Sequence, residues 1–330
     1  MPGKKRKPSQ SPAQLMSRLS RRGPHRVLRG DLGIVGVAGH VFTPDEGRRL
    51  PAIAFGHGWL AGSARYRDLI HHLASWGIVV AVPEGQGGLL ASDVGLAADL
   101  RSTLAIVSNV PLGLGKVTVD PARIGLAGHG FGASAAVIAA SDQQLLGQAP
   151  PPVRGVAALF PAPTTGELVP AARLVTAPGV IVAGSGEIDT VGVNALPLAE
   201  VYGQASGEDD TSADVVLRTL PGATARGLLE RRTLKSLIGG HGADPKTHQF
   251  VRALCTGFFL HTLTDDPEYK AFVDPDAALG KSVVVDLADP PPEPLDKVSR
   301  LLGAKPRKRH PLARVAAAAL ARPEGPARSA

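Results

Sequence analysis

The residues of most chemical interest lie in the stretch 123–134, which reads Arg-Ile-Gly-Leu-Ala-Gly-His-Gly-Phe-Gly-Ala-Ser. An apolar run passes there through a glycine-rich turn into an alanine-rich segment, the pattern of a strand, a sharp turn and a helix. In a G-x-S-x-G nucleophile elbow, such a turn presents a serine hydroxyl for attack on a carbonyl carbon. Gly130 occupies the serine position, between Gly128 and Gly132. The sequence therefore predicts an elbow whose nucleophile position carries no side chain.

Three further motifs follow apolar runs that are typical of buried strands. His57-Gly58 comes after the run 52–55, and a tight His-Gly turn exposes backbone N–H groups of the kind that line an oxyanion hole. Asp189 follows the run 179–183, with Glu187 as a competing acid, and His241 follows the run 233–238. Ligands of such sheets bind beyond the carboxyl ends of the strands. The chain order of elbow, acid and histidine is the order of an α/β-hydrolase triad.

With these motifs the chain resembles a branch of the α/β-hydrolases that contains polyester-degrading cutinases, chlorophyllase-like esterases and dienelactone-hydrolase relatives. The resemblance extends over residues 30–279 and includes an Asp-x-x-Tyr-x-x-Phe segment at 266–272. It implies oxyanion donors at the Trp59 and Phe131 N–H groups, a triad acid at Asp189 and a triad base at His241. We expect His57 to shape the oxyanion turn and His129 to be a packed supporting residue.

The glycine at position 130 means that the resemblance to the family does not imply the family's activity. The triad mechanism requires a hydroxyl that the histidine deprotonates, so no acyl-enzyme can form at Gly130. The leading hypothesis is a catalytically degenerate esterase that binds an ester or lipid-like ligand, or acts as a scaffold. A slow hydrolase is the alternative, with water activated by His241 and Asp189, or with Ser134 as the nucleophile. Ser134 lies roughly 6 Å further along the helix axis, at about 1.5 Å per residue, which moves it away from the elbow.

A nucleotide-binding protein is a further alternative from another functional class. Gly128, Gly130 and Ala133 also match the dinucleotide fingerprint G-x-G-x-x-G/A. That motif requires an acid at the end of the next strand to bind the ribose. The next strand ends at Leu159-Phe-Pro161 without an acid, which counts against this alternative.

The strands and helices expected around these motifs alternate along the chain. Continuous apolar strands separated by amphipathic helices indicate an α/β-hydrolase fold, a mostly parallel sheet with helices on both faces. We expect core strands at 52–55, 77–82, 123–127, 156–160, 179–183 and 233–238, and helices at 66–76, 94–107 and 132–140. A pair of segments at 33–37 and 39–42 could form an edge hairpin, and 281–286 a late edge strand. The segment 191–232 is the least regular.

Charge divides the chain into three parts. Residues 1–30 hold nine Lys/Arg and no acid, and residues 296–330 hold nine Lys/Arg and two acids. We therefore expect a disordered basic tail at 1–29, an α/β-hydrolase domain at 30–285, and a Pro-rich linker with a basic tail at 286–330. The basic tails could bind an anionic membrane surface or nucleic acid, or remain solvated.

Cysteine content and the lack of a secretory signal indicate the compartment. Cys255 is the single cysteine, which excludes an internal disulfide and fits a cytoplasmic protein. The basic tails would also allow a peripheral position at a membrane. No His, Cys, Asp and Glu spacing is typical of a metal site, and we expect no cofactor.

Overall fold

The computed structural model describes residues 10–88, 90–163, 166–186, 188, 194–204, 213–230 and 243–290. Three expected features lie outside these residues: the strand 233–238, the basic residues at 1–9, and the tail from 291 onward.

Within the described residues, one nine-stranded sheet forms the centre of the fold, in the order β1-β2-β4-β3-β5-β6-β7-β8-β9. The six strands from β4 to β8 pair in parallel, and β1, β2 and β9 pair antiparallel at the two margins. The strands are β1 Val27–Asp31, β2 Gly39–Pro44, β3 Gly47–Gly56, β4 Val79–Pro83, β5 Val117–His129, β6 Val153–Leu159, β7 Gly179–Gly184, β8 Val215–Leu220 and β9 Val283–Val284.

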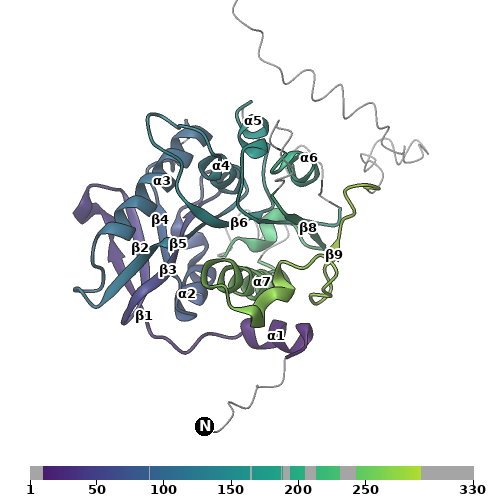
Figure 1. The fold of residues 1–330 in the computed structure, drawn as a ribbon, viewed down its shortest axis with the longest axis horizontal. Coiled ribbons are helices and arrows are strands. Elements are labelled where there is room, and N and C mark those ends of the chain that lie inside the picture. The colour runs from purple at the N-terminus through teal and green to yellow at the C-terminus, as the bar shows by residue number, and fades with distance from the viewer. Residues whose placement is uncertain are drawn as a thin grey trace, which may run out of the picture.

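Helices cover both faces of the sheet (Figure 1). One apolar core lies between the sheet and α3, α4, α5 and α6, and a second lies between the sheet and α1, α2 and α7. The α-helices are α1 Pro12–Leu19, α2 Arg67–Ser75, α3 Asp93–Asn109, α4 Phe131–Ala140, α5 Leu168–Arg173, α6 Ala195–Val201 and α7 Pro245–Thr264. The 3-10 helices are η1 Leu32–Val35, η2 Ser63–Arg65, η3 Ala225–Leu228 and η5 Pro267–Phe272.

The central strands form where the sequence predicts them, because each is a short, continuously apolar run. All five residues of β4 and all six of β7 are buried, which requires cover on both faces. The predicted helices correspond to α2, α3 and α4. These elements confirm the fold class, a mostly parallel sheet with helices on both faces, as in an α/β-hydrolase.

Two strands lie where the sequence did not predict them. The first strand of the edge hairpin is β1, and part of the segment expected to form it is the 3-10 helix η1. Strand β8 lies within the segment 191–232, which we expected to be irregular. Its buried Arg218, 1% exposed, donates to the carbonyl groups of Asp274 and Ala277. A charged residue in an interior position explains why the apolar pattern of β8 was missed.

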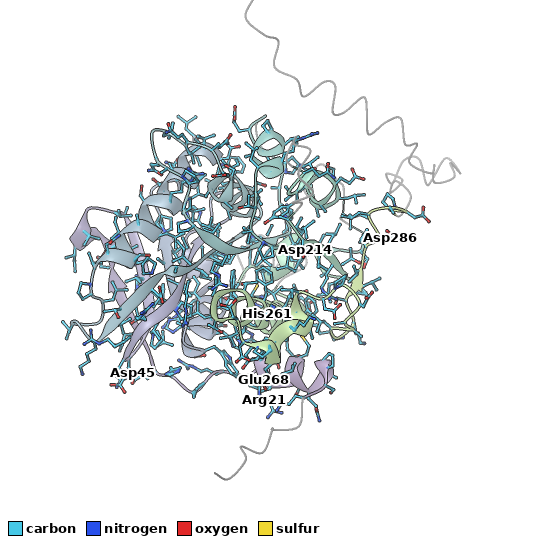
Figure 2. All side chains as sticks on the ribbon, in the orientation of Figure 1. Arg21, Asp45, Asp214, His261, Glu268 and Asp286 are labelled. Atoms are coloured by element: carbon cyan, nitrogen blue, oxygen red, sulfur yellow. The ribbon has the colours of Figure 1, made fainter. Side chains whose placement is uncertain are left out.

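The expectation of a disordered tail through residue 29 is wrong for residues 12–29. Helix α1 packs on α7 with Leu15 and Leu19 buried, and the Ser11 side chain caps its first turn. Arg18 pairs with Glu268 at 2.8 Å, and Glu268 lies beside α1 in Figure 2. The basic composition of the segment concealed an amphipathic helix whose apolar side is part of the core.

The C-terminal margin of the sheet agrees with the predicted late edge strand. Strand β9 pairs antiparallel with β8, through Val283 and Val284. Cys255 is buried in α7, where it is a core residue, and burial raises the pKa of its thiol.

Candidate functional site

The turn between β5 and α4 has the geometry of an elbow. Gly130 follows the last residue of β5 and precedes the first residue of α4, with φ 58° and ψ −120°. This left-handed conformation is strained for residues with a Cβ atom. The Gly130 N–H donates to the Leu159 carbonyl at 2.9 Å, and the Ala162 N–H donates to the Gly130 carbonyl at 3.1 Å. The turn is therefore held by the end of β6 and by the segment that follows it.

The glycines around the elbow differ in the space they leave. A Cβ atom on Gly128 would lie 2.1 Å from the Gly132 oxygen, and one on Gly132 would lie 2.2 Å from the Gly56 carbonyl carbon. At Gly130 a Cβ atom would meet nothing within 4 Å among the described residues. Gly128 and Gly132 are thus required by close backbone packing, whereas no described residue fills the space beside position 130.

The His57-Gly58-Trp59 turn lies next to the elbow. Strands β3 and β5 are parallel neighbours, with Gly56 paired to Gly128, so both turns leave the same edge of the sheet. The Gly58 N–H donates to the Tyr66 hydroxyl at 2.9 Å. Among the described residues the Trp59 N–H has no acceptor. The Phe131 N–H begins α4, where a helix leaves its N–H groups without intrahelical partners.

His57 is directed into the turn itself. Its side chain is fully buried, and Nδ1 lies 3.0 Å from the Gly58 carbonyl oxygen. The carbonyl can only accept, so Nδ1 carries the proton and stabilises the turn. The structure therefore gives His57 a supporting contact with the backbone of the turn.

His129 lies beneath the elbow, inside the protein. Its Nδ1 is 2.8 Å from the Tyr66 hydroxyl, and the rings of Phe55, Tyr66 and Phe160 surround the contact. Burial lowers the pKa of His129 to about 4, and the Ala225 backbone acts in the opposite direction. The ring is therefore neutral at pH 7.

Ser134 is placed away from the elbow. It is fully buried, and its hydroxyl donates to the Ala162 carbonyl at 2.6 Å. A hydroxyl already committed to a backbone carbonyl inside the helix packing is poorly placed to attack a substrate. This geometry argues against Ser134 as a substitute nucleophile.

The glycine-rich stretch also serves helix packing in this fold. The close contact of Gly128 with Gly132 brings α4 against the sheet. Strand β6 is followed by Phe160 and Pro161, so the acid that would bind a ribose is absent there. These features give no support to nucleotide binding through Gly128, Gly130 and Ala133.

Asp189, its competitor Glu187, and His241 lie outside the described residues. Their roles therefore remain predictions. The described residues next to the histidine segment end at Glu230, whose N–H donates to the Arg65 carbonyl at 2.9 Å. The Glu230 carboxylate accepts from the backbone N–H groups of Asp68 and Leu69, and burial raises its pKa to about 7. This carboxylate caps the N-terminus of α2.

Tyr66, Glu84 and Glu230 are neighbours of the site that the sequence did not predict. Tyr66 begins an amphipathic helix and its spacing resembles that of a core aromatic residue. Glu84 follows β4, and its Oε1 accepts from the Ser63 N–H at 2.7 Å. A strand-end position was the available signal for Glu84, since polar residues at this edge of a parallel sheet often serve a site.

The sheet, its helices and the elbow define a protein with an α/β-hydrolase fold. Residues 37–146 match the family model for chlorophyllases. The matched residues extend from β2 to α4 and include both the His57 turn and the elbow. The match covers about a third of the chain. No curated protein matches the sequence.

The described part of the chain contains no helix long and apolar enough to cross a bilayer. Nor do the described side chains include a group of three or more His, Cys, Asp or Glu that could hold a metal ion.

Proposed function

We propose that this chain is an α/β-hydrolase of the carboxylesterase or cutinase-like type that binds an ester or lipid-like ligand without forming an acyl-enzyme. In this proposal Trp59 and Phe131 donate to the ligand's carbonyl oxygen, and Asp189 and His241 are the acid and the base. The observation that carries it is the elbow at Gly130, with its positive φ and open space for a side chain. The turn has the shape that exposes a nucleophile, and glycine supplies none.

Exposed apolar side chains near the elbow support a hydrophobic ligand. Trp59 is 56% and Leu60 54% exposed, in a turn closed by the Ala61 N–H and the Gly58 carbonyl. Leu90, 98% exposed, follows the neighbouring strand β4. Large exposed apolar residues beyond the ends of strands are typical of a ligand or interaction surface. An acyl chain or an aromatic ester would cover them.

A slow hydrolase is the second candidate, and the open space at Gly130 favours it. A water molecule held there could be activated by His241 and oriented by the two N–H donors. Enzymes that lack a triad member retain a rate enhancement on the order of 10³ over water through the oxyanion hole and binding. We also propose a cytoplasmic protein, on the basis of the single cysteine, with basic tails that bind an anionic membrane surface or nucleic acid.

Ligand binding and covalent reaction at a serine can be measured separately in the natural chain. Titration with a non-hydrolysable ketone analogue of a p-nitrophenyl ester, which keeps the carbonyl oxygen and replaces the ester oxygen by a methylene group, should quench Trp59 fluorescence, and a Trp76→Phe variant isolates that signal. A fluorophosphonate, which labels activated serines, should leave no covalent adduct by mass spectrometry. Ligand-dependent quenching without an adduct supports the proposal. A stoichiometric adduct would show that another nucleophile operates, and no quenching at millimolar analogue would refute ligand binding.

A further inference from the structure

The turn that carries Trp59 is connected to the elbow through one side chain, that of Tyr66. The Tyr66 hydroxyl accepts from the Gly58 N–H at 2.9 Å and lies 2.8 Å from Nδ1 of His129, the residue before Gly130. Tyr66 is fully buried, and burial raises the pKa of its hydroxyl, which therefore keeps its proton. The hydroxyl already accepts from the Gly58 N–H, so we assign the tautomer of His129 in which the Nδ1 lone pair accepts the Tyr66 proton.

The contact leaves little freedom for any of its members. A Cβ atom on Gly58 would lie 2.8 Å from the Tyr66 hydroxyl oxygen and 3.3 Å from Nδ1 of His129. The rings of Phe55 and Tyr66 are 5.1 Å apart, and those of Tyr66 and His129 are 5.5 Å apart. The hydroxyl therefore lies enclosed between the two turns, with the Gly58 N–H and Nδ1 of His129 as its partners.

A second fixed point lies at the other half of the same turn. Glu84, at the end of β4, accepts from the Ser63 N–H, and the Tyr66 N–H donates to the Ser63 carbonyl at 3.0 Å. The segment from Gly58 to Tyr66 is thus anchored to β4 through Glu84. Its remaining adjustable point is the position of Gly58 relative to β5, which Tyr66 and His129 determine.

We propose that Tyr66 is a positioning residue that aligns the Trp59 N–H with the Phe131 N–H by joining Gly58 to His129. The inference rests on the proposed function, because it assumes that these two N–H groups form one oxyanion-binding pair. The Gly58 N–H donates to the Tyr66 hydroxyl and is not free for a ligand. The next N–H along the chain, that of Trp59, is therefore the one that faces the ligand. Displacement of Gly58 would separate the two donors. Preorganised donors of this kind are effective only at the correct spacing.

The test compares two buried tyrosines. Tyr66→Phe removes the hydroxyl that joins the turns. Tyr202→Phe removes a buried hydroxyl that donates to the Ala177 carbonyl at 3.0 Å, in a contact between α6 and the start of β7. In amide NMR spectra of the full natural chain, Tyr66→Phe should shift the Trp59 and Phe131 signals and increase Gly58 amide exchange about tenfold or more. Tyr202→Phe should leave all three unchanged.

A kinetic measurement complements the spectra. In the full-length Gly130→Ser chain, Tyr66→Phe should lower kcat for p-nitrophenyl butyrate about tenfold or more and leave KM within about twofold. Should Gly130→Ser be inert, the proposed function fails, while the spectra of the natural chain still decide the role of Tyr66.

A second pair of variants serves if Tyr66→Phe does not fold. His129→Asn keeps an acceptor near the position of Nδ1 and should preserve the Trp59 and Phe131 signals, whereas His129→Leu should displace them. Unchanged Trp59 and Phe131 signals in a folded Tyr66→Phe or His129→Leu chain would overturn the inference.

Discussion

A Cβ atom on Gly132 would lie 2.2 Å from the carbonyl carbon of Gly56, so helix α4 and strand β3 contact each other backbone to backbone. The contact brings the first turn of α4 against the strand that precedes the His57 turn. It explains how the Phe131 and Trp59 N–H groups leave the same edge of the sheet. The close backbone packing of the elbow is therefore made by Gly132 and Gly56, and position 130 takes no part in it.

Alanine substitutions should distinguish the two kinds of glycine in the elbow. Gly132→Ala should lower the free energy of unfolding by about 3 kcal/mol, because a buried Cβ atom would overlap the Gly56 backbone. Gly130→Ala should cost only about 1–2 kcal/mol, the strain of a left-handed residue in open space. Urea unfolding measures both values. Equal losses would show that the elbow is packed differently.

Ser134 should contribute to stability and not to chemistry. Ser134→Ala should cost about 1 kcal/mol in urea unfolding, because it removes the hydrogen bond to the Ala162 carbonyl. In the Gly130→Ser chain the same substitution should leave kcat for p-nitrophenyl butyrate unchanged. A loss of turnover in the natural chain on Ser134→Ala would instead make Ser134 the nucleophile.

Helix α1 should behave as part of the domain. Leu15→Ala and Leu19→Ala should each lower the free energy of unfolding by about 2–3 kcal/mol, since both side chains are buried against α7. Leu114→Ala, at a fully exposed leucine, is the matched control and should change it by less than about 0.5 kcal/mol. Equal effects of the three substitutions would mean that α1 does not pack on the domain and belongs to a disordered tail.

Stability should fall on acidification because of His129. Its pKa is about 4 in the folded chain and near 6.5 when unfolded, so between these values the unfolded chain binds more protons. The contribution of His129 to the free energy of unfolding is about 3 kcal/mol. It is fully present above pH 6.5 and is lost as the pH falls toward 4. His72, which burial shifts to about 4 as well, acts in the same direction.

The measurement is the urea midpoint at several pH values. The midpoint should decrease steadily from pH 7 to pH 4.5, and His129→Asn should reduce that slope. A natural chain and a His129→Asn chain with the same slope would mean that His129 titrates normally in the folded state.

The parallel centre of the sheet was predictable because strands buried on both faces are continuous apolar runs. The elbow was predictable for a local reason, since three alternating glycines between a strand and a helix are typical of a sharp turn with close backbone packing. Strand β8 was missed because Arg218 interrupts its apolar run, and the carbonyl groups that accept from Arg218 are some 56 residues or more away. Such long-range compensation is not visible in a local pattern.

In the candidate site, too, the features set by local sequence were predictable and the long-range contacts were not. Strand ends identified the His57 turn and Gly130, whose positions follow from chain order. The contact of Tyr66 with His129 joins residues 63 positions apart and depends on how α2 packs against the sheet. Similarly, α1 was missed because basic residues dominate the segment 1–30 around it, whereas α1 itself holds one basic residue, Arg18, and buries only two leucines, Leu15 and Leu19.

In the proposed function, one absent hydroxyl separates this site from that of a working esterase. The most direct measurement is the turnover of p-nitrophenyl butyrate by the full-length Gly130→Ser chain. Gly147→Ser is the matched control, because Gly147 also has a positive φ and open space, in a turn after α4.

We predict at least a 100-fold gain in kcat/KM over the natural chain for Gly130→Ser, abolished by adding His241→Ala, and no gain for Gly147→Ser. A folded Gly130→Ser chain with no more activity than Gly147→Ser would show that the site lacks more than a hydroxyl at position 130.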